Sequence, residues 1–425
     1  MKKKTVLTLA GIASIASASA QGLYYVGQEA NESIPLTWVA GASMIWDNNV
    51  TPLITPGNPG FEDEAWSINP YIQANFTNVD PQTTINFYAR LGANYYIESL
   101  EAQGADEIVP NMRLGFDFNH SVSPRLRFSS RNFLSYEMEP EFAVGISNDR
   151  TVEPYFFYSS DNSVGYRWTE RVGSYTGFGF TGYMGDVQFA DRKSWNIYHQ
   201  MRYQFNQRTV LTSQYRYAAW TGDANESTNH FITGGVEYRL SQNSVFVGSA
   251  GVQFRSVDNG GDNSSPFLEA SVRSQMNSSF SIRGFARFSM EDFDTIQFVG
   301  GNTFEYSNQQ VLRLGMTGEY RLSPRLTGFG GMDLIHTMYD DGNQINIPIS
   351  GTGKDSGRTE DLVNAYIGLR TRLTDELTGD CSINYTDSTS DFENNDYDRI
   401  RLSAGLSYTS VSYTHLRAHG QAEIS

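Results

Sequence analysis

Arginine recurs at alternate positions in several stretches of the chain, most densely at Arg125, Arg127 and Arg131. Guanidinium groups stay charged at physiological pH and present a planar fork of donors, so a row of them can attract anions or bind carboxylates. Such a row can equally be structural, pairing with acids and stiffening the surface that carries it. The candidate selectivity residues on this basis are Arg113, Asp117, Arg125, Arg127, Arg131, Arg202, Arg216 and Arg313.

The stretches that carry these residues alternate strictly between apolar and polar side chains. Between residues 66 and 77, Trp66 and Ile68 fall on one face, whereas Ser67 and Asn69 fall on the other. A period of two sustained over about 10 to 13 residues predicts strands long enough to cross a bilayer at a tilt. Strands of soluble sandwiches are usually nearer 5 or 6 residues. The pattern therefore predicts strands with one lipid-facing side and one polar side.

Short connections rich in Pro, Ser, Thr, Asn and Asp join these stretches in pairs, because such residues favour tight turns. They lie at Asp80-Pro81, Ser123-Pro124, Thr169-Glu170, Asn206-Gln207, Ser241-Gln242, Asn277-Ser278, Ser323-Pro324 and Thr374-Asp375. Longer polar connections separate one pair from the next. With one strand before the first pair and one after the last, we expect an all-β fold: a transmembrane antiparallel β-barrel of about 18 strands, or 16, with short periplasmic turns and long extracellular loops.

The N-terminus has a cationic start, a short apolar stretch and small residues before Gln21, which predicts a secretory signal peptide over residues 1–20. We expect a short periplasmic segment at 21–34 and the barrel at 35–410. The 425 residues include 25 Tyr, 26 Phe and 39 Gly, and this abundance of aromatics and glycine is typical of many-stranded proteins. Cys381 is the one cysteine, so no disulfide framework is possible.

Residues 411–425 break the alternating pattern. Their sequence, VSYTHLRAHGQAEIS, matches the translation of a transposase-type sequencing adapter from Val411 to His419. We interpret this segment as a non-native tail, so His415 and His419 are not counted among candidate ligands.

The signal peptide, the hairpin repeats and the terminal strand together resemble the bacterial β-barrel porin family of outer-membrane proteins. The resemblance covers residues 21–410 and rests on pattern, because no diagnostic motif is present. It implies an outer-membrane location, contact with membrane lipid and lipopolysaccharide, insertion by the barrel-assembly machinery, and passage of small hydrophilic solutes. Since many porins form trimers, it also implies a possible homo-oligomer.

Assigning faces by alternation places most arginines of the strands on the polar, inward side. Fewer acids share that side, namely Asp117, Glu237, Glu269, Glu319, Asp333 and Asp380. Because charged walls in a low-dielectric tube concentrate counter-ions, the sequence predicts a passive channel that favours anions. The alternative is a closed structural or surface-receptor barrel without conductance. Residues 288–308 and 337–361 are long enough to fold inward and set the aperture.

Other chemistry has weaker support in the sequence. Acidic loops offer calcium candidates at Asp258, Asp262, Asp340 and Asp341, but neither loop has EF-hand spacing and solvated turns explain them as well. No hydrolase, metalloprotease or nucleotide motif is present, which predicts no enzymatic activity and no cofactor. The net charge of −16 argues against nucleic acid as a partner.

Overall fold

A computed structural model describes the chain in segments with gaps between them. The described residues are 33–49, 64–97, 108–137, 155–185, 191–222, 226–258, 261–291, 296–299, 302–306, 308–340, 342–344, 354–355, 357–391 and 397–411. The predicted signal peptide and all but the first residue of the predicted non-native tail lie outside these residues.

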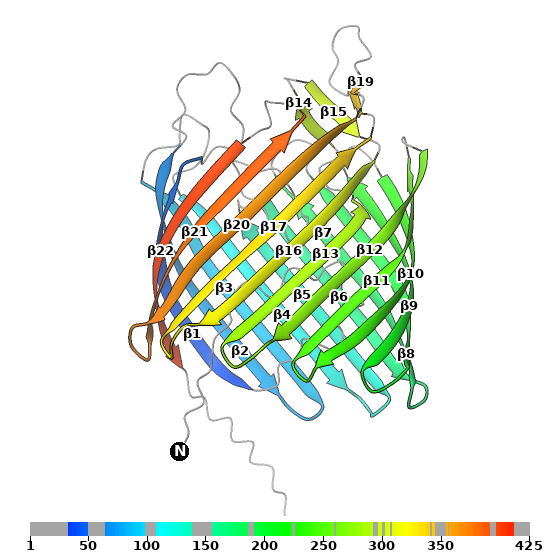
Figure 1. Ribbon diagram of the computed structural model, residues 1–425, viewed down its shortest axis with the longest axis horizontal. Helices are drawn as coiled ribbons and strands as arrows, with labels where there is room; N and C mark the ends of the chain where they lie inside the picture. Colours follow the sequence, from blue (N-terminus) through cyan, green and yellow to red (C-terminus); the bar gives the residue numbers. More distant parts are fainter. Residues whose placement is uncertain are drawn as a thin grey trace, which may run out of the picture.

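A single 18-stranded antiparallel sheet forms the wall of a closed barrel (Figure 1). Its strands are β1 Ile34–Asp47, β2 Ala65–Val79, β3 Thr83–Tyr96, β4 Ile108–Ser121, β5 Leu126–Glu137, β6 Tyr155–Arg167, β7 Val172–Met184, β8 Arg192–Gln204, β9 Thr209–Gly222, β10 Glu226–Ser241, β11 Ser244–Val257, β12 Gly261–Gln275, β13 Phe280–Met290, β16 Gln309–Arg321, β17 Leu326–Tyr339, β20 Arg358–Arg372, β21 Leu377–Ser390 and β22 Tyr397–Val411. The predicted fold class and the preferred strand number are confirmed.

Each strand pairs with its neighbours along the chain, and the first strand pairs with the last. The β1–β22 register runs from Thr37↔Val411 to Asp47↔Arg401. Closing the sheet on itself satisfies the backbone donors and acceptors of both edge strands, which a bilayer requires because hydrocarbon offers no hydrogen bonds. β1 begins at Ile34, and Val411 belongs to β22.

All eight short connections predicted from the sequence join adjacent strands, at β2–β3, β4–β5, β6–β7, β8–β9, β10–β11, β12–β13, β16–β17 and β20–β21. In the Ser323-Pro324 turn, Ser323 Oγ accepts the backbone N–H of Leu326 at 3.1 Å. The same bond to the residue three positions on is made by Ser123, Thr169, Asn277 and Thr374. A Ser, Thr or Asn side chain at the start of the turn thus replaces a backbone acceptor, which is why these residues recur there.

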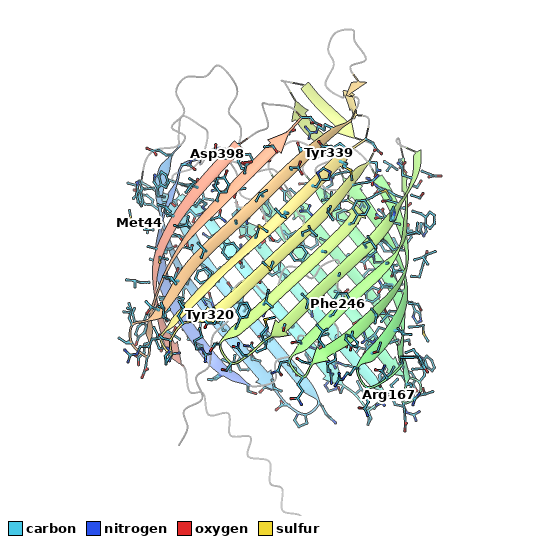
Figure 2. The ribbon with its side chains drawn as sticks, viewed as in Figure 1. Met44, Arg167, Phe246, Tyr320, Tyr339 and Asp398 are labelled. Atoms are coloured by element: carbon cyan, nitrogen blue, oxygen red, sulfur yellow. The ribbon has the colours of Figure 1, made fainter. Side chains whose placement is uncertain are left out.

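The two faces of the wall differ as the alternation predicts. Trp38, Ile72 and Ile367 are exposed on the outside by 44%, 48% and 68%, whereas inward neighbours such as Gln73 are buried. Met44 projects from the outer surface of the barrel, and Arg167 lies at the rim that carries the short turns (Figure 2). Following the rule for outer-membrane barrels, this rim is termed periplasmic and the opposite rim extracellular.

A second sheet of 4 strands lies at the extracellular rim, above the wall (Figure 1). It is formed by β14 Ile296–Val299, β15 Asn302–Tyr306, β18 Gly342–Gln344 and β19 Lys354–Asp355. These strands come from the two connections that the sequence marked as long enough to fold inward. Within the described segments, no helix is long and apolar enough to cross a membrane.

Candidate functional site

One half of the inner wall carries charged side chains near the middle of successive strands. We call this set the charged belt; its members are Asp117, Arg131, Asp161, Tyr198, Arg216, Glu269, Arg287, Arg313 and Glu291. The belt runs from β4 to β16, and Glu291 directly follows β13. Because inward and outward positions alternate, a strand can place one such side chain in the belt; β7, β10 and β11 contribute none, and each of the other strands of the barrel wall from β4 to β16 contributes one.

The first part of the belt is a chain of contacts across β4, β5, β6 and β8. Arg131 Nε lies 3.5 Å from Asp117 Oδ1, and Arg131 is also the cross-strand neighbour of Asp161. The Tyr198 hydroxyl donates to Asp161 Oδ1 at 3.4 Å. Asp161 is buried, and the Tyr198 phenol satisfies its Oδ1 atom, whereas its Oδ2 atom has no hydrogen-bond partner among the described residues and is offset by the nearby charge of Arg131.

The belt crosses β7 without a β7 side chain. Gly177 occupies the inward position there, and a Cβ atom at Gly177 would lie 2.2 Å from the Tyr198 ring. The absence of a side chain therefore lets the Tyr198 ring lie over β7 and reach Asp161 on β6. The alternation of Gly177 with outward Phe178 supports the interpretation of this glycine-rich stretch as barrel wall.

The second part of the belt rests on buried aromatic rings. The Arg216 guanidinium lies 3.9 Å from the centroid of the Phe231 ring, which packs edge-on against Phe267. Both rings are buried against Ala218. A guanidinium group over an aromatic face is held by the ring quadrupole as well as by packing. Arg216 is thereby fixed on the lumen surface.

The last part of the belt contains two glutamates, Glu269 and Glu291, next to its arginines. Glu269 is the cross-strand neighbour of Arg287 and interacts electrostatically with both Arg287 and Arg216. Arg287 in turn faces Arg313 across β13 and β16, and Arg313 Nη2 lies 2.8 Å from Glu291 Oε2. The belt thus contains as many carboxylates as guanidinium groups, so its charge is balanced.

The opposite half of the inner wall carries amides and hydroxyls instead. Asn364 Oδ1 accepts hydrogen bonds from Asn384 at 2.8 Å and from Thr386 at 3.0 Å. The hydroxyls of Ser382 and Ser403 lie 2.7 Å apart. We call Ser382, Asn364, Asn384, Thr386 and Ser403 the amide wall. This stretch of the wall is lined mainly by neutral hydrogen-bonding groups, with two charged residues at its edges: Asn364 Nδ2 donates to Asp333 Oδ2 at 3.3 Å, and Arg401 is the cross-strand neighbour of Asn384.

A third set of inward charges lies nearer the periplasmic rim. Arg273 and Arg283 face each other across β12 and β13, and Arg283 interacts electrostatically with Glu319. Arg370 Nη1 lies 3.8 Å from Glu319 Oε1, and Asp380 is the cross-strand neighbour of Arg370. We call these five residues the periplasmic cluster. With three guanidinium groups and two carboxylates, it carries net positive charge.

The base of the connection between β13 and β16 lies against the inner side of the barrel. Gln253 on β11 donates to the Met290 carbonyl at 3.0 Å and accepts the Met290 N–H at 2.9 Å. Arg255 donates to Asn308 Oδ1 at 3.2 Å, and Asn308 donates to Asp340 Oδ2 at 3.0 Å. Since β12 lies between β11 and β13 in the sheet, these contacts place the loop base over the lumen side of β12. The extracellular end of the lumen is narrowed there.

The structure brings some of the predicted site residues together and separates others. Arg113 pairs with Glu137, with Arg113 Nε donating at 2.8 Å, and Arg202 Nη2 lies 2.6 Å from Glu237 Oε2. Arg127 faces inward below Arg131, next to Ser121 of β4. Asp117, Arg131, Arg216 and Arg313 belong to the charged belt.

Arg125 requires a correction. The sequence placed it on the same strand as Arg127, but β5 begins at Leu126 and Arg125 lies exposed in the periplasmic turn. Its carbonyl accepts the N–H of Arg167 at 2.8 Å. The β4–β5 ladder ends at the pair Ser121 and Arg127, so Arg125 has no cross-strand partner on β4 and belongs to the turn.

Inward acids were under-predicted. Asp161 and Glu291 in the belt, together with Glu137 and Asp47, were not among the expected inward acids. Asp47 accepts from Arg399 Nε at 3.0 Å. The pairing of Asp161 with Arg131 depends on strand register, which the sequence alone does not supply.

The calcium candidates do not converge on one another. Asp340 accepts from Asn308, the Asp258 N–H donates to the Glu226 carbonyl, and Asp262 is exposed on β12. Asp341 lies outside the described residues. Within the described part of the chain, no group of 3 or more His, Cys, Asp or Glu side chains could hold a metal ion.

The histidines of the described segments face outward, away from the lumen. The Nδ1 atoms of His120, His199 and His230 bond to Thr83, Thr176 and Tyr215 on adjacent strands, at 2.9, 2.9 and 2.8 Å. The Nδ1 atom of His336 lies 2.7 Å from Oδ1 of Asp361. These imidazoles thus serve cross-strand contacts on the outer surface.

Residues 240–409 match the family model of the outer membrane protein beta-barrel domain. Among solved structures, the chain is similar to the outer membrane protein OpdK from Pseudomonas aeruginosa (12% identity, 90% of this chain and 100% of that one, TM-score 0.42) and to OccAB4 from Acinetobacter baumannii (10%, 89% and 100%, 0.43). It is also similar to the siderophore receptor PirA from Acinetobacter baumannii (7%, 90% and 81%, 0.39). No curated protein sequence matches the chain.

The family match covers the strands from the end of β10 to β22, and the remaining strands continue the same closed sheet. Membrane-length strands, an apolar outside and a polar inside accompany it. The chain folds as a closed 18-stranded antiparallel β-barrel, and its C-terminal part is similar to the outer membrane protein beta-barrel domain.

Proposed function

We propose that the protein is a channel through which small hydrophilic solutes diffuse passively across the outer membrane, with a preference for anions. The observation that carries this proposal is the charged inner wall of an 18-stranded barrel. Barrels of 16 to 18 strands are wide enough to enclose an aqueous path, whereas 8-stranded barrels are filled by their own side chains.

The anion preference rests on the periplasmic cluster more than on the charged belt. The charged belt has equal numbers of positive and negative groups. It should therefore select solutes by the positions of their charges rather than by their net charge. In the periplasmic cluster, Arg273 and Arg283 are directly opposed, and the guanidinium groups outnumber the carboxylates of Glu319 and Asp380. An excess of fixed positive charge at a lumen entrance raises the local concentration of anions.

The test is single-channel conductance of the folded protein in a planar bilayer under a potassium chloride gradient. Stable conductance with a reversal potential displaced toward that of chloride is expected. The Arg283→Gln variant should move the reversal potential toward zero, while Arg125→Gln, a change in the exposed turn, is the matched control. A potassium-selective channel would contradict the anion preference but not the channel.

A closed barrel is the second candidate, and one observation favours it. Side chains beneath the loop base are almost fully buried, with Gln253, Gln309 and Arg255 exposed by 1%, 0% and 2%. If this packing continued across the lumen, no ion path would remain. Absence of conductance from protein that shows heat-modifiable gel mobility, and is therefore folded, would favour a structural or receptor barrel.

A further inference from the structure

Four small polar side chains lie on the outer face of the barrel at the middle of β5 and β6. They are Ser130 and Asn132 on β5 and Ser160 and Asn162 on β6, and we call them the Ser/Asn ring. The intervening residues, Arg131 and Asp161, face the lumen, so the ring points the other way. Ser130 is paired with Asn162, and Asn132 with Ser160.

The four side chains form a closed cycle of hydrogen bonds. The Ser130 hydroxyl donates to Asn162 Oδ1 at 2.7 Å, and Asn162 Nδ2 donates to Ser160 Oγ at 3.0 Å. The Ser160 hydroxyl donates to Asn132 Oδ1 at 2.8 Å, and Asn132 Nδ2 donates to Ser130 Oγ at 3.0 Å. Each member therefore gives one hydrogen bond and accepts one within the ring.

The surroundings of the ring are apolar. Phe116 on β4 is the neighbour of Asn132, and Phe180 and Phe178 on β7 are the neighbours of Ser160 and Asn162. These rings are exposed by 41%, 45% and 38% on the outside of the barrel. The mid-strand position places the Ser/Asn ring at the depth of the hydrocarbon core.

Polar groups at that depth are costly when they face lipid, because acyl chains cannot hydrogen-bond. The cycle uses some of the hydrogen-bond donors and acceptors of each side chain, but not all of them. A carboxamide has two N–H donors and two acceptor lone pairs, and the ring uses one donor and one acceptor of Asn162. A second protein surface could satisfy the remainder, whereas lipid could not.

We infer that the outer face of β5 and β6 docks against a second copy of this chain, ring to ring. The same Ser-x-Asn pattern occurs on both strands in opposite directions. Beyond the cycle, Asn132 Nδ2 donates to the Phe116 carbonyl at 3.5 Å, whereas one N–H of Asn162 and one lone pair on each of the four oxygens remain outside it. The patch therefore presents both a donor and acceptors, so two copies can bond each other. Self-complementary patches are what two-fold interfaces require. The ring carries no formal charge, so it offers an ionic partner nothing to pair with, and Phe116, Phe178 and Phe180 supply apolar contact around it.

The first test is thiol cross-linking of the folded protein in phosphatidylcholine vesicles. Cys381 is exposed, so the background variant is Cys381→Ser. On that background, Ser130→Cys replaces one ring atom nearly isosterically, and Ile367→Cys is the matched control on the outer face of β20. With a short bismaleimide, we expect a band of twice the monomer mass for Ser130→Cys and no such band above background for Ile367→Cys. Equal bands, or no dimer with Ser130→Cys, would overturn the inference.

The second test removes the polarity of the ring. The fourfold variant Ser130→Ala, Asn132→Leu, Ser160→Ala, Asn162→Leu should shift the particle mass, measured by light scattering in mild detergent, from two chains to one. Heat-modifiable gel mobility checks that the variant is folded. A wild-type monomer, or a variant that remains dimeric, would contradict the proposal. Neither measurement depends on conductance, so their outcome is independent of whether the barrel is a channel.

Discussion

The charged belt and the amide wall occupy opposite halves of the same lumen and are built in different ways. In the belt, each charged group depends on a partner from another strand, as Asp161 does on Arg131 and Tyr198. In the amide wall, Asn364 Oδ1 accepts from the neutral groups of Asn384 and Thr386, and only its Nδ2 contacts a charged group, the carboxylate of Asp333 at 3.3 Å. Loss of one belt partner leaves a charge behind, whereas loss of one amide-wall partner leaves only an amide or hydroxyl. The two halves should therefore respond very differently to single substitutions.

The largest effect is expected from Arg313→Met. Arg313 and Glu291 are exposed by 2% and 6%, so the substitution leaves a buried carboxylate without its guanidinium partner. Breaking one side of such a pair typically costs about 3 kcal/mol of unfolding free energy. The urea midpoint of unfolding in lipid vesicles, followed by tryptophan fluorescence, measures it. The double variant Arg313→Met with Glu291→Gln should recover much of the loss; an unchanged midpoint in the single variant would show that the pair contributes little.

An intermediate effect, on selectivity, is expected from Glu269→Gln. The substitution removes the carboxylate that interacts with both Arg216 and Arg287. One charge about 8 Å from the ion path in a water-like dielectric is worth roughly 0.5 kcal/mol, or about a twofold change in permeability ratio. Reversal potentials should therefore shift toward chloride. Asn364→Asp, which adds one negative charge to the amide wall, should shift them toward potassium by a similar amount; reversal-potential shifts of the same sign for the two variants would refute these charge assignments.

The smallest effect is expected from Ser382→Ala in the amide wall. The change removes one neutral hydrogen bond, that between Ser382 and Ser403, worth about 0.5 to 1 kcal/mol. The urea midpoint should fall slightly and the reversal potential should not move. A change in selectivity here as large as that of Glu269→Gln would mean that the ion path runs along the amide wall rather than the belt.

The wall of the barrel could be predicted from the sequence because its signals are local. Period-two alternation and turn residues act within one hairpin, and Ser323 and its equivalents close their turns with their own side chains. The one error in placement among the site residues, at Arg125, is a strand boundary shifted past a proline. Such boundaries depend on where the neighbouring strand ends its ladder, which is not a local property.

The belt could be predicted only in part, for two physical reasons. Its contacts depend on strand register. Tyr198 on β8 reaches Asp161 on β6 across Gly177 of β7, so both the β6–β7 and the β7–β8 registers must be known. In β6, moreover, the alternation fails because Ser160 and Asn162 put polar groups on the outer face, so the inward position of Asp161 is not marked by apolar neighbours on both sides. Ser160 and Asn162, which obscure the alternation pattern around Asp161, also belong to the Ser/Asn ring.

The seam between β1 and β22 has a consequence for how the protein is made. Asp47 and Arg399, 352 residues apart in the sequence, form a buried ion pair at its extracellular end. Until β22 is synthesised, the sheet has two open edges that can pair with other chains. Closure joins the most distant parts of the chain, which is entropically costly and slow, so it comes late in folding. The nascent protein must therefore be kept from aggregating until its last strand is available. Formation of the β1–β22 pairing is the step at which a damaged C-terminal strand would arrest assembly.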